Sequence, residues 1–206
     1  ADSWQSDTDV PDVARFGGTL VTYANNLYYF GGSNGTNYLN DGQVSTIGYK
    51  TGTIAQSGTT LTGSGTTWTS AMVGSKVQYP DGSTSTITAF GSTTSLTVDV
   101  SKSVTAGSIY TIQDGSIGAW VFTTSMPKSV SQAEGFASNG YLYLVGGRSS
   151  NTSCNPTTMI APISANTTIA TGNNPTGVGE WSETNVRYAG GRYGAAVAYE
   201  EGKVYI

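Results

Sequence analysis

The sequence predicts an all-β protein, and two observations support this fold class. Ser, Thr and Gly together make up 84 of the 206 residues (25, 31 and 28), a composition that disfavours helices and favours short strands joined by tight turns. Thirteen tyrosines and four tryptophans accompany only 11% charged residues, whereas disordered chains are poor in aromatic side chains. We therefore expect a folded chain of short strands, long enough for one large β domain or two small ones.

Internal repeats define how the chain is organised. An apolar run ending in Gly-Gly occupies residues 27–32 (LYYFGG) and 142–147 (LYLVGG), and residues 204–206 (VYI) begin it a third time. Each copy follows a tryptophan, and the first and third copies also follow an Arg-aromatic-Gly triplet; these residues are Trp4, Trp120 and Trp181, with Arg15–Gly17 and Arg192–Gly194. The second copy has Ser131 at the position aligned with the arginines.

Each copy is predicted to contain a hairpin and an inner strand. Residues 21–23 and 27–30 form two short strands around Asn25-Asn26, a favourable turn pair because asparagine tolerates positive φ. The apolar strand that ends in Gly-Gly is predicted to be buried inside a sheet. The two glycines allow a bulge or a close approach of backbone.

These residues resemble kelch repeats, whose blades carry the Arg, the apolar strand with Gly-Gly, and the Trp. The resemblance covers residues 1–51 and 114–206 and implies kelch-like blades of a β-propeller. Fewer than three copies are present, whereas propellers have roughly four to eight blades. We therefore expect an incomplete ring, with further blades after Ile206; the alternative is an open stack of sheets completed by neighbouring copies.

Residues 52–113 interrupt the first repeat and are expected to form an inserted small β domain. Strands are predicted at 59–62, 76–79, 85–90, 95–100 and 109–112, separated by turns at 63–65, 81–82 and 91–92. The run from Ser57 to Gly74, with residues 87–90 and 95–98, is similar to a module common in phage tail and virion-associated proteins. Trp68 and Met72 are interpreted as core residues of this module rather than a binding platform.

No catalytic, cofactor-binding or metal-binding residue is assigned. The chain has no histidine, which removes imidazole catalysis and the usual copper, zinc and non-haem iron sites. Asp2, Asp7, Asp9 and Asp12 suggest calcium by their spacing, but a solvated loop is the favoured interpretation.

The remaining candidate residues are given structural or surface roles. The carboxylates of Glu134, Glu180 and Glu183 cannot be placed as a glycosidase pair from the sequence. Arg15 and Arg192 are interpreted as braces between strands. Cys154, the single cysteine, is either a free thiol or the partner of a cysteine beyond Ile206.

Composition also limits the partners and the location. Nine scattered Lys and Arg residues and a net charge of −4 form no basic stripe for a nucleic acid. No apolar run is long enough to span a membrane. A low-charge surface rich in Ser, Thr, Asn and Gly fits a secreted protein, an extracellular surface protein or a virion protein.

The leading hypothesis is a non-enzymatic binding or adhesion module. Rigid blades would present polar loops, with residues 34–40 and 151–155 recognising a glycan or protein surface; which residues bind is not assigned. One alternative is a structural subunit of an extracellular filament, surface layer or phage tail, pairing with copies of itself through exposed strand edges. Another is part of a propeller enzyme whose catalytic residues follow Ile206, because propellers host both binding and catalysis.

Overall fold

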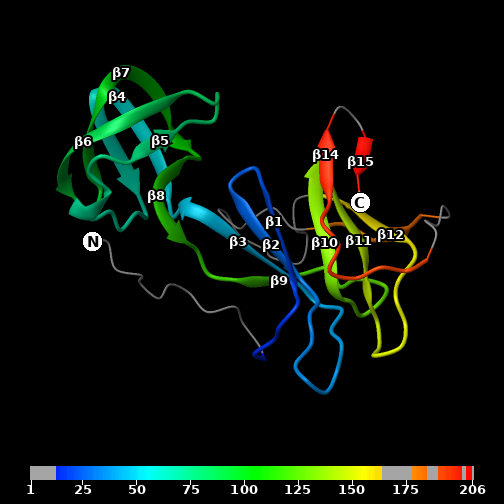
Figure 1. Cartoon of the computed structure of the whole chain (residues 1–206). Coiled ribbons are helices and arrows are strands. Elements are labelled where there is room, and N and C mark those ends of the chain that lie inside the picture. The colour runs from blue at the N-terminus through cyan, green and yellow to red at the C-terminus, as the bar shows by residue number, and fades with distance from the viewer. Residues whose placement is uncertain (1–12, 164–177, 185–189, 201–202, 206) are drawn as a thin grey trace, which may run out of the picture. The chain divides into compact units, whose positions relative to one another are not determined.

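The computed structural model describes residues 13–163, 178–184, 190–200 and 203–205. Strands dominate this part of the chain, and its helical structure is limited to one 3₁₀ turn, η1 (Ser70–Met72) (Figure 1). The prediction of an all-β protein is confirmed, and the strands form several antiparallel sheets. Among the same residues, no helix is long and apolar enough to cross a lipid bilayer.

The chain divides into two compact units. The described residues of one are 46–118, and those of the other, here called the repeat unit, are 13–45, 119–163, 178–184, 190–200 and 203–205. The first of these units therefore extends beyond the predicted insert, 52–113, at both ends. The reason is that strand β3 (Gly42–Tyr49) contributes its first residues to the repeat unit and its last residues to the other.

The repeat unit contains two four-stranded antiparallel arrays. The strand order of the first is β1 (Thr19–Tyr23), β2 (Asn26–Phe30), β3 and β9 (Val121–Thr123). The order of the second is β10 (Ser131–Ser138), β11 (Tyr141–Arg148), β12 (Thr158–Pro162) and β13 (Ser182–Glu183). A two-stranded sheet follows, made of β14 (Ala198–Glu200) and β15 (Lys203–Tyr205).

The sequence repeat and the sheets are out of phase by one strand. Trp120 directly precedes β9, which pairs with β3 of the first array, and Trp181 directly precedes β13, which pairs with β12 of the second. The strand after each of these two tryptophans therefore completes the sheet of the preceding repeat. Trp4 lies outside the described residues.

Successive repeats are joined by equivalent backbone hydrogen bonds. The N–H of Gly32 donates to the carbonyl oxygen of Val130, and the N–H of Gly147 donates to that of Arg192, both at 2.8 Å. Gly32 and Gly147 are the second glycines of the two Gly-Gly pairs, and each bond reaches the segment that opens the next repeat. Three successive repeats thus have the same backbone connection.

The hairpin turns use left-handed residues, as predicted, but the first turn lies one residue earlier. Ala24 and Asn25 have φ of 47° and 58°, the conformation of a type I′ turn. Asn26 belongs to β2, and its side-chain amide donates to the carbonyl of Ala24 at 3.0 Å. The predicted pair Asn25-Asn26 is therefore wrong by one position, because Asn26 caps the turn from inside the strand.

The Gly-Gly pairs permit the close approach that their sequence indicated. Gly31 and Gly32 have φ of 62° and 99°, and Gly146 and Gly147 have φ of 70° and 84°. A side chain at Gly31 would collide with the backbone oxygen of Val130. Both apolar strands are inner strands of their arrays, as predicted, and alternate residues of β2 are fully buried.

Arg15 braces the first array, as predicted. Its guanidinium donates to both carboxylate oxygens of Asp41 at 2.7 and 2.8 Å and to the carbonyl of Gly31 at 3.2 Å. Its side chain is only 4% exposed. Arg192, at the equivalent position of the third repeat, is an exposed residue instead.

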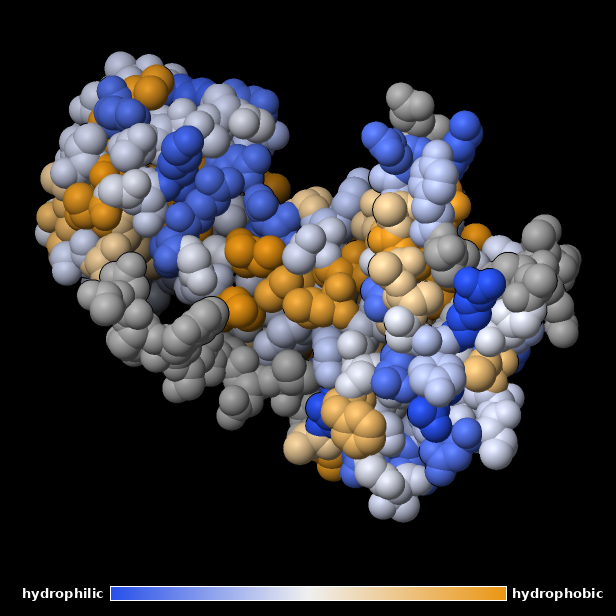
Figure 2. All heavy atoms as spheres, viewed as in Figure 1, coloured by the Kyte–Doolittle hydropathy of each residue, from blue (hydrophilic) through white to orange (hydrophobic). Residues whose placement is uncertain are grey.

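The unit at 46–118 is one antiparallel sheet around its own core. From the end of β3 the strand order is β8 (Thr111–Ile117), β5 (Lys76–Gln78), β6 (Thr84–Ser92), β7 (Ser95–Ser108) and β4 (Thr53–Ser64). Strands β4 and β7 are longer than predicted because Ile54 pairs with Ser108 beyond two bulges. On the face shown in Figure 2, hydrophilic and intermediate residues predominate over this unit.

Trp68 and Met72 lie in that core, as predicted, and are 1% and 6% exposed. The indole N–H of Trp68 donates to the hydroxyl of Tyr110 at 2.9 Å, and this hydroxyl donates to the carbonyl of Thr51 at 2.7 Å. Burial raises the pKa of the Tyr110 hydroxyl far above its ordinary value, which keeps it neutral.

Candidate functional site

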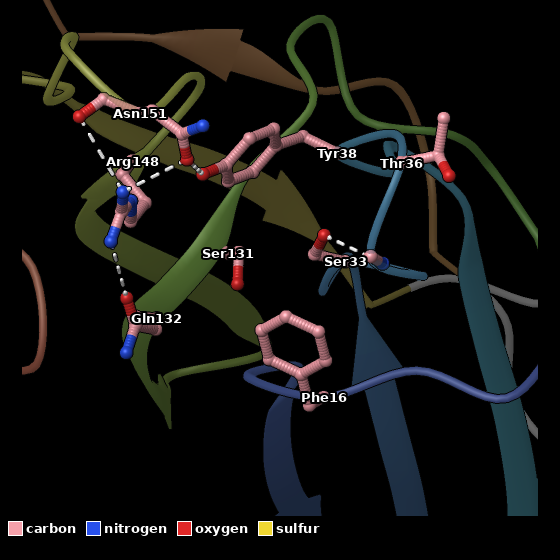
Figure 3. Close-up of a pocket in the computed structure, with 9 residues that line it drawn as sticks. Phe16, Ser33, Thr36, Tyr38, Ser131, Gln132, Arg148 and Asn151 are labelled. Carbon is pink, nitrogen blue, oxygen red and sulfur yellow. Dashed lines mark hydrogen bonds between the residues drawn. The ribbon is translucent and has the colours of Figure 1, made fainter.

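A pocket of about 260 Å³ lies in the repeat unit, between the loops that follow β2 and β11. Its wall carries one cation, two aromatic rings and several amide and hydroxyl groups (Figure 3). The residues that determine its chemistry are Phe16, Ser33, Tyr38, Gln132, Arg148 and Asn151.

The first wall is the loop after β2. Ser33 forms a two-way backbone bridge with Phe16, at 2.9 Å in both directions, and a further bridge with Tyr38. Within the loop, the side-chain oxygen of Asn34 accepts the backbone N–H groups of Thr36 and Asn37 at 3.0 and 2.7 Å. This asparagine turn shapes the loop that brings Tyr38 to the pocket.

The second wall is the loop after β11. Two backbone hydrogen bonds close the base of this loop. The N–H of Asn155 donates to the carbonyl oxygen of Gly147 at 2.8 Å, and the N–H of Ser149 donates to that of Ser153 at 3.0 Å. Arg148 stands at the start of the loop and Asn151 at its tip, both facing the pocket in Figure 3.

The two walls touch. The hydroxyl of Tyr38 donates to the side-chain oxygen of Asn151 at 2.9 Å, so the structure brings together the two segments predicted to recognise a ligand, 34–40 and 151–155. The far end of the second segment does not take part, because Asn155 is buried and its side-chain oxygen accepts from Thr157.

Arg148 is the cation of the pocket, and its guanidinium contacts neutral groups. It donates to the side-chain oxygens of Asn151 at 3.2 Å and Gln132 at 3.5 Å and to the carbonyl of Ser150 at 3.4 Å. The guanidinium carbon lies 4.8 Å from the centre of the Tyr193 ring and 6.0 Å from that of Tyr38. The cation is thus held between aromatic rings.

The pocket is built from equivalent positions of successive repeats. Ser33 and Arg148 both directly follow a Gly-Gly pair. Ser131 pairs with Arg148 as Phe16 pairs with Ser33. Ser131 is therefore the equivalent of Phe16, not of Arg15 as the sequence alignment suggested, and the alignment is wrong by one residue. Where the first and third repeats have Phe16 and Tyr193, the second has a small side chain.

Gln132 has a backbone conformation that its repeat partners achieve with glycine. Its φ is 57°, and those of Gly17 and Gly194 are 66° and 62°. Backbone hydrogen bonds link the three residues. The N–H of Gln132 donates to the carbonyl oxygen of Gly17 at 2.6 Å, and the carbonyl oxygen of Gln132 accepts from the N–H of Gly194 at 2.9 Å. A left-handed glutamine costs about 1–2 kcal/mol, and such strain concentrates at functional sites.

Sequence reasoning did not identify Phe16, Tyr38, Gln132 and Arg148 as neighbours in one site. A correct alignment of the repeats would have placed Gln132 against two glycines, a signal that needs no structure. No comparable signal marks Tyr38, because its position in the pocket depends on the fold of its loop.

None of the other candidate residues that the structure describes lines this pocket. Asp2, Asp7, Asp9 and Asp12 are outside the described residues; within the described ranges, no cluster of His, Cys, Asp and Glu could hold a metal ion. Cys154 is half-buried with a free thiol, and its backbone bridges that of Arg148. The glutamates are dispersed: Glu183 pairs with Lys128 at 2.8 Å, Glu180 is exposed, and Glu134 is on β10.

Comparisons with known proteins give distant structural likenesses. No known protein family matches the chain, and no curated protein matches it. Among solved structures, phage phi92 endosialidase is 12% identical, with a TM-score of 0.26 over 91% of this chain and 39% of that chain. The structure of YjhT is 11% identical, with a TM-score of 0.30 over 88% of this chain and 49% of that one. This chain thus spans less than half of either protein.

Proposed function

We propose that the protein is a non-catalytic recognition module of an extracellular or virion surface, which binds a saccharide in the pocket between the loops at 33–38 and 148–151. Kelch-like blades of a β-propeller are the proposed scaffold, supported by the two four-stranded arrays and the equivalent hydrogen bonds between repeats. The unit at 46–118 is proposed to be a spacer or decoration. The observation that carries the proposal is the meeting of two loops around a polar, aromatic-edged pocket.

The pocket wall suits a sugar. Gln132 and Asn151 offer amide donors and acceptors, and Thr36 offers a hydroxyl, which together match the alternating donors and acceptors of sugar hydroxyls. Phe16 is 62% exposed, and its ring offers an apolar surface to the C–H face of a sugar ring. The volume, about 260 Å³, is below the roughly 300–1,000 Å³ of pockets for drug-sized ligands, so we expect one sugar ring to enter.

A binding role is proposed over a catalytic one because of the groups that line the pocket. The lining residues that the structure describes supply a guanidinium, amides, hydroxyls and rings. They include neither of the two carboxylates that most glycoside hydrolases use.

The experiment is a glycan array on the full chain, followed by calorimetry with each bound saccharide. We expect Asn151→Ala to weaken binding about tenfold, since it removes the oxygen that accepts from Tyr38 and Arg148. Tyr141→Ala is the matched control, because Tyr141 is an exposed residue of β11 outside the pocket. An array without any bound glycan, or equal affinity of Asn151→Ala and the parent, contradicts the proposal; binding of proteins alone would favour a protein ligand.

One observation favours self-assembly as a second candidate function. The six residues of β14 and β15 are all exposed, including Val204 and Tyr205 at 44% and 53%. In the described part of the chain β15 pairs with β14 alone, and exposed apolar strand edges pair with other chains. Sedimentation velocity over a hundredfold concentration range tests this candidate: we expect larger species that Val204→Glu abolishes, and a strict monomer would eliminate it.

A further inference from the structure

Among the described residues, Arg15 is paired with a carboxylate and Arg148 is not. Arg15 has two hydrogen bonds of 2.7 and 2.8 Å to one carboxylate. Those of Arg148 are 3.2–3.5 Å long, and all of them go to neutral oxygens. Hydrogen bonds between a guanidinium and a carboxylate are about 2.7–2.9 Å long and are among the strongest in proteins. The Arg148 guanidinium is therefore held in the pocket without a strong acceptor in the described residues.

The side chains around Arg148 hold it in position for an anion. Tyr193 comes from the third repeat and lies 4.8 Å from the guanidinium, and ring contacts of this kind orient its plane. Gln132 and Asn151 contact its two terminal nitrogens, as the dashed lines in Figure 3 show. A carboxylate entering the pocket can replace these two long contacts by a bidentate pair without moving the arginine.

Gln132 provides independent evidence that the pocket binds a ligand. Glycine would avoid the left-handed strain, and both equivalent positions have glycine. The glutamine instead places an amide beside Arg148, where its oxygen accepts from the guanidinium and its nitrogen can donate to an anion. Strain retained at a pocket-lining position indicates a role for the side chain itself.

We propose that the ligand of this pocket is an acidic sugar, with its carboxylate bound by Arg148 and its hydroxyls by the amides of Gln132 and Asn151. This inference rests on the proposed function and adds the ligand class. The described lining residues include one cation, which can pair with one carboxylate of the ligand, and the net charge of −4 gives the chain no general attraction for anions. One carboxylate on an otherwise neutral, hydroxyl-rich ring matches these charges.

The backbone around the pocket disfavours an acidic peptide. Ser33 is bridged on one side by Phe16 and on the other by Tyr38, and Arg148 is bridged by Ser131 and Cys154. The strand residues of both walls are therefore already paired on each side. A peptide would find no free strand edge for the main-chain pairing that such ligands use.

The test is calorimetry on the full chain with trigalacturonate and with galactotriose. Each ring of trigalacturonate has a carboxylate where the rings of galactotriose have a hydroxymethyl group. We expect trigalacturonate to bind at least tenfold more tightly at low salt. Arg148→Gln is expected to weaken trigalacturonate binding about tenfold more than it weakens galactotriose binding. Lys76→Gln removes the same charge from the other unit and is the control for net charge; it should change neither affinity. Circular dichroism establishes that each variant is folded, and Arg148→Lys keeps the charge while losing the bidentate geometry, so an intermediate affinity is expected.

The outcomes separate this inference from the proposed function. If the two trisaccharides bind equally and Asn151→Ala weakens the binding of both, the proposal of an acidic ligand is refuted, whereas the proposal of a saccharide site is retained. Absence of binding for both, together with an empty glycan array, overturns both proposals. If Arg148→Gln still binds trigalacturonate more tightly than galactotriose by the same factor, the carboxylate binds elsewhere and the role of Arg148 is refuted. If the protein binds galactose 6-sulfate more tightly than trigalacturonate, an anion site is retained, but the proposal that its ligand is a carboxylate is refuted.

Discussion

Replacing Gln132 by glycine is expected to make the protein more stable and a weaker binder. The residue has φ of 57° between two glycines of similar conformation. Relief of the left-handed strain gains about 1–2 kcal/mol, and the added freedom of glycine in the unfolded chain offsets about 0.5–1 kcal/mol of this. The lost bond to Arg148 is 3.5 Å long and contributes little. We expect a net gain of about 0.5–1 kcal/mol, or about 1–4 °C in Tm for a chain of this size.

The assay compares thermal unfolding with amide exchange along β10 and β11, because a chain with two compact units need not unfold in one step. Gln132→Ala removes the side-chain amide and keeps the strain, so it should not be stabilised. Ala137→Gly, on the same strand but without a positive φ, should lose about 0.5–1 kcal/mol. The reasoning is refuted if Gln132→Gly is no more stable than Gln132→Ala.

Three further changes have defined consequences. Arg15→Ala should lower the stability of the repeat unit by about 2–4 kcal/mol in urea denaturation, because it leaves the Asp41 carboxylate half-buried without its partner; a loss below 0.5 kcal/mol would contradict the bracing role. Trp68→Phe should accelerate amide exchange throughout residues 46–118 by an amount equivalent to about 1–2 kcal/mol, since it removes the indole N–H bond to a buried tyrosine, and unchanged exchange would be inconsistent with the proposed core. Asp81 accepts from Lys102 and Ser83, which lower the pKa of its carboxyl from 3.8 to about 2; its contribution to stability is therefore complete above pH 4 and lost as the pH falls toward 2, and a carboxyl ¹³C titration with a midpoint near 4 would disprove it.

Much of the local structure follows from residue patterns because it depends on short-range chemistry. Positive φ at asparagine and glycine defines the hairpins, alternation of apolar side chains defines the strands, and a Trp in a Ser/Thr-rich segment indicates the core of the unit at 46–118. Two of the errors are shifts of one residue, at the turn before Asn26 and in the alignment of Ser131. In both cases strand pairing decided the register, and pairing involves residues far apart in the sequence.

By itself, the sequence determined an all-β chain with a repeated apolar strand, an interrupted first repeat and no histidine chemistry. Only the tertiary structure decided that Phe16, Tyr38, Gln132 and Arg148 share one pocket, and that the strands after Trp120 and Trp181 complete the preceding sheets. The physical reason is that the walls of the pocket belong to different repeats, more than a hundred residues apart at Tyr38 and Asn151. Their meeting depends on backbone hydrogen bonds between repeats, and no local pattern encodes these bonds.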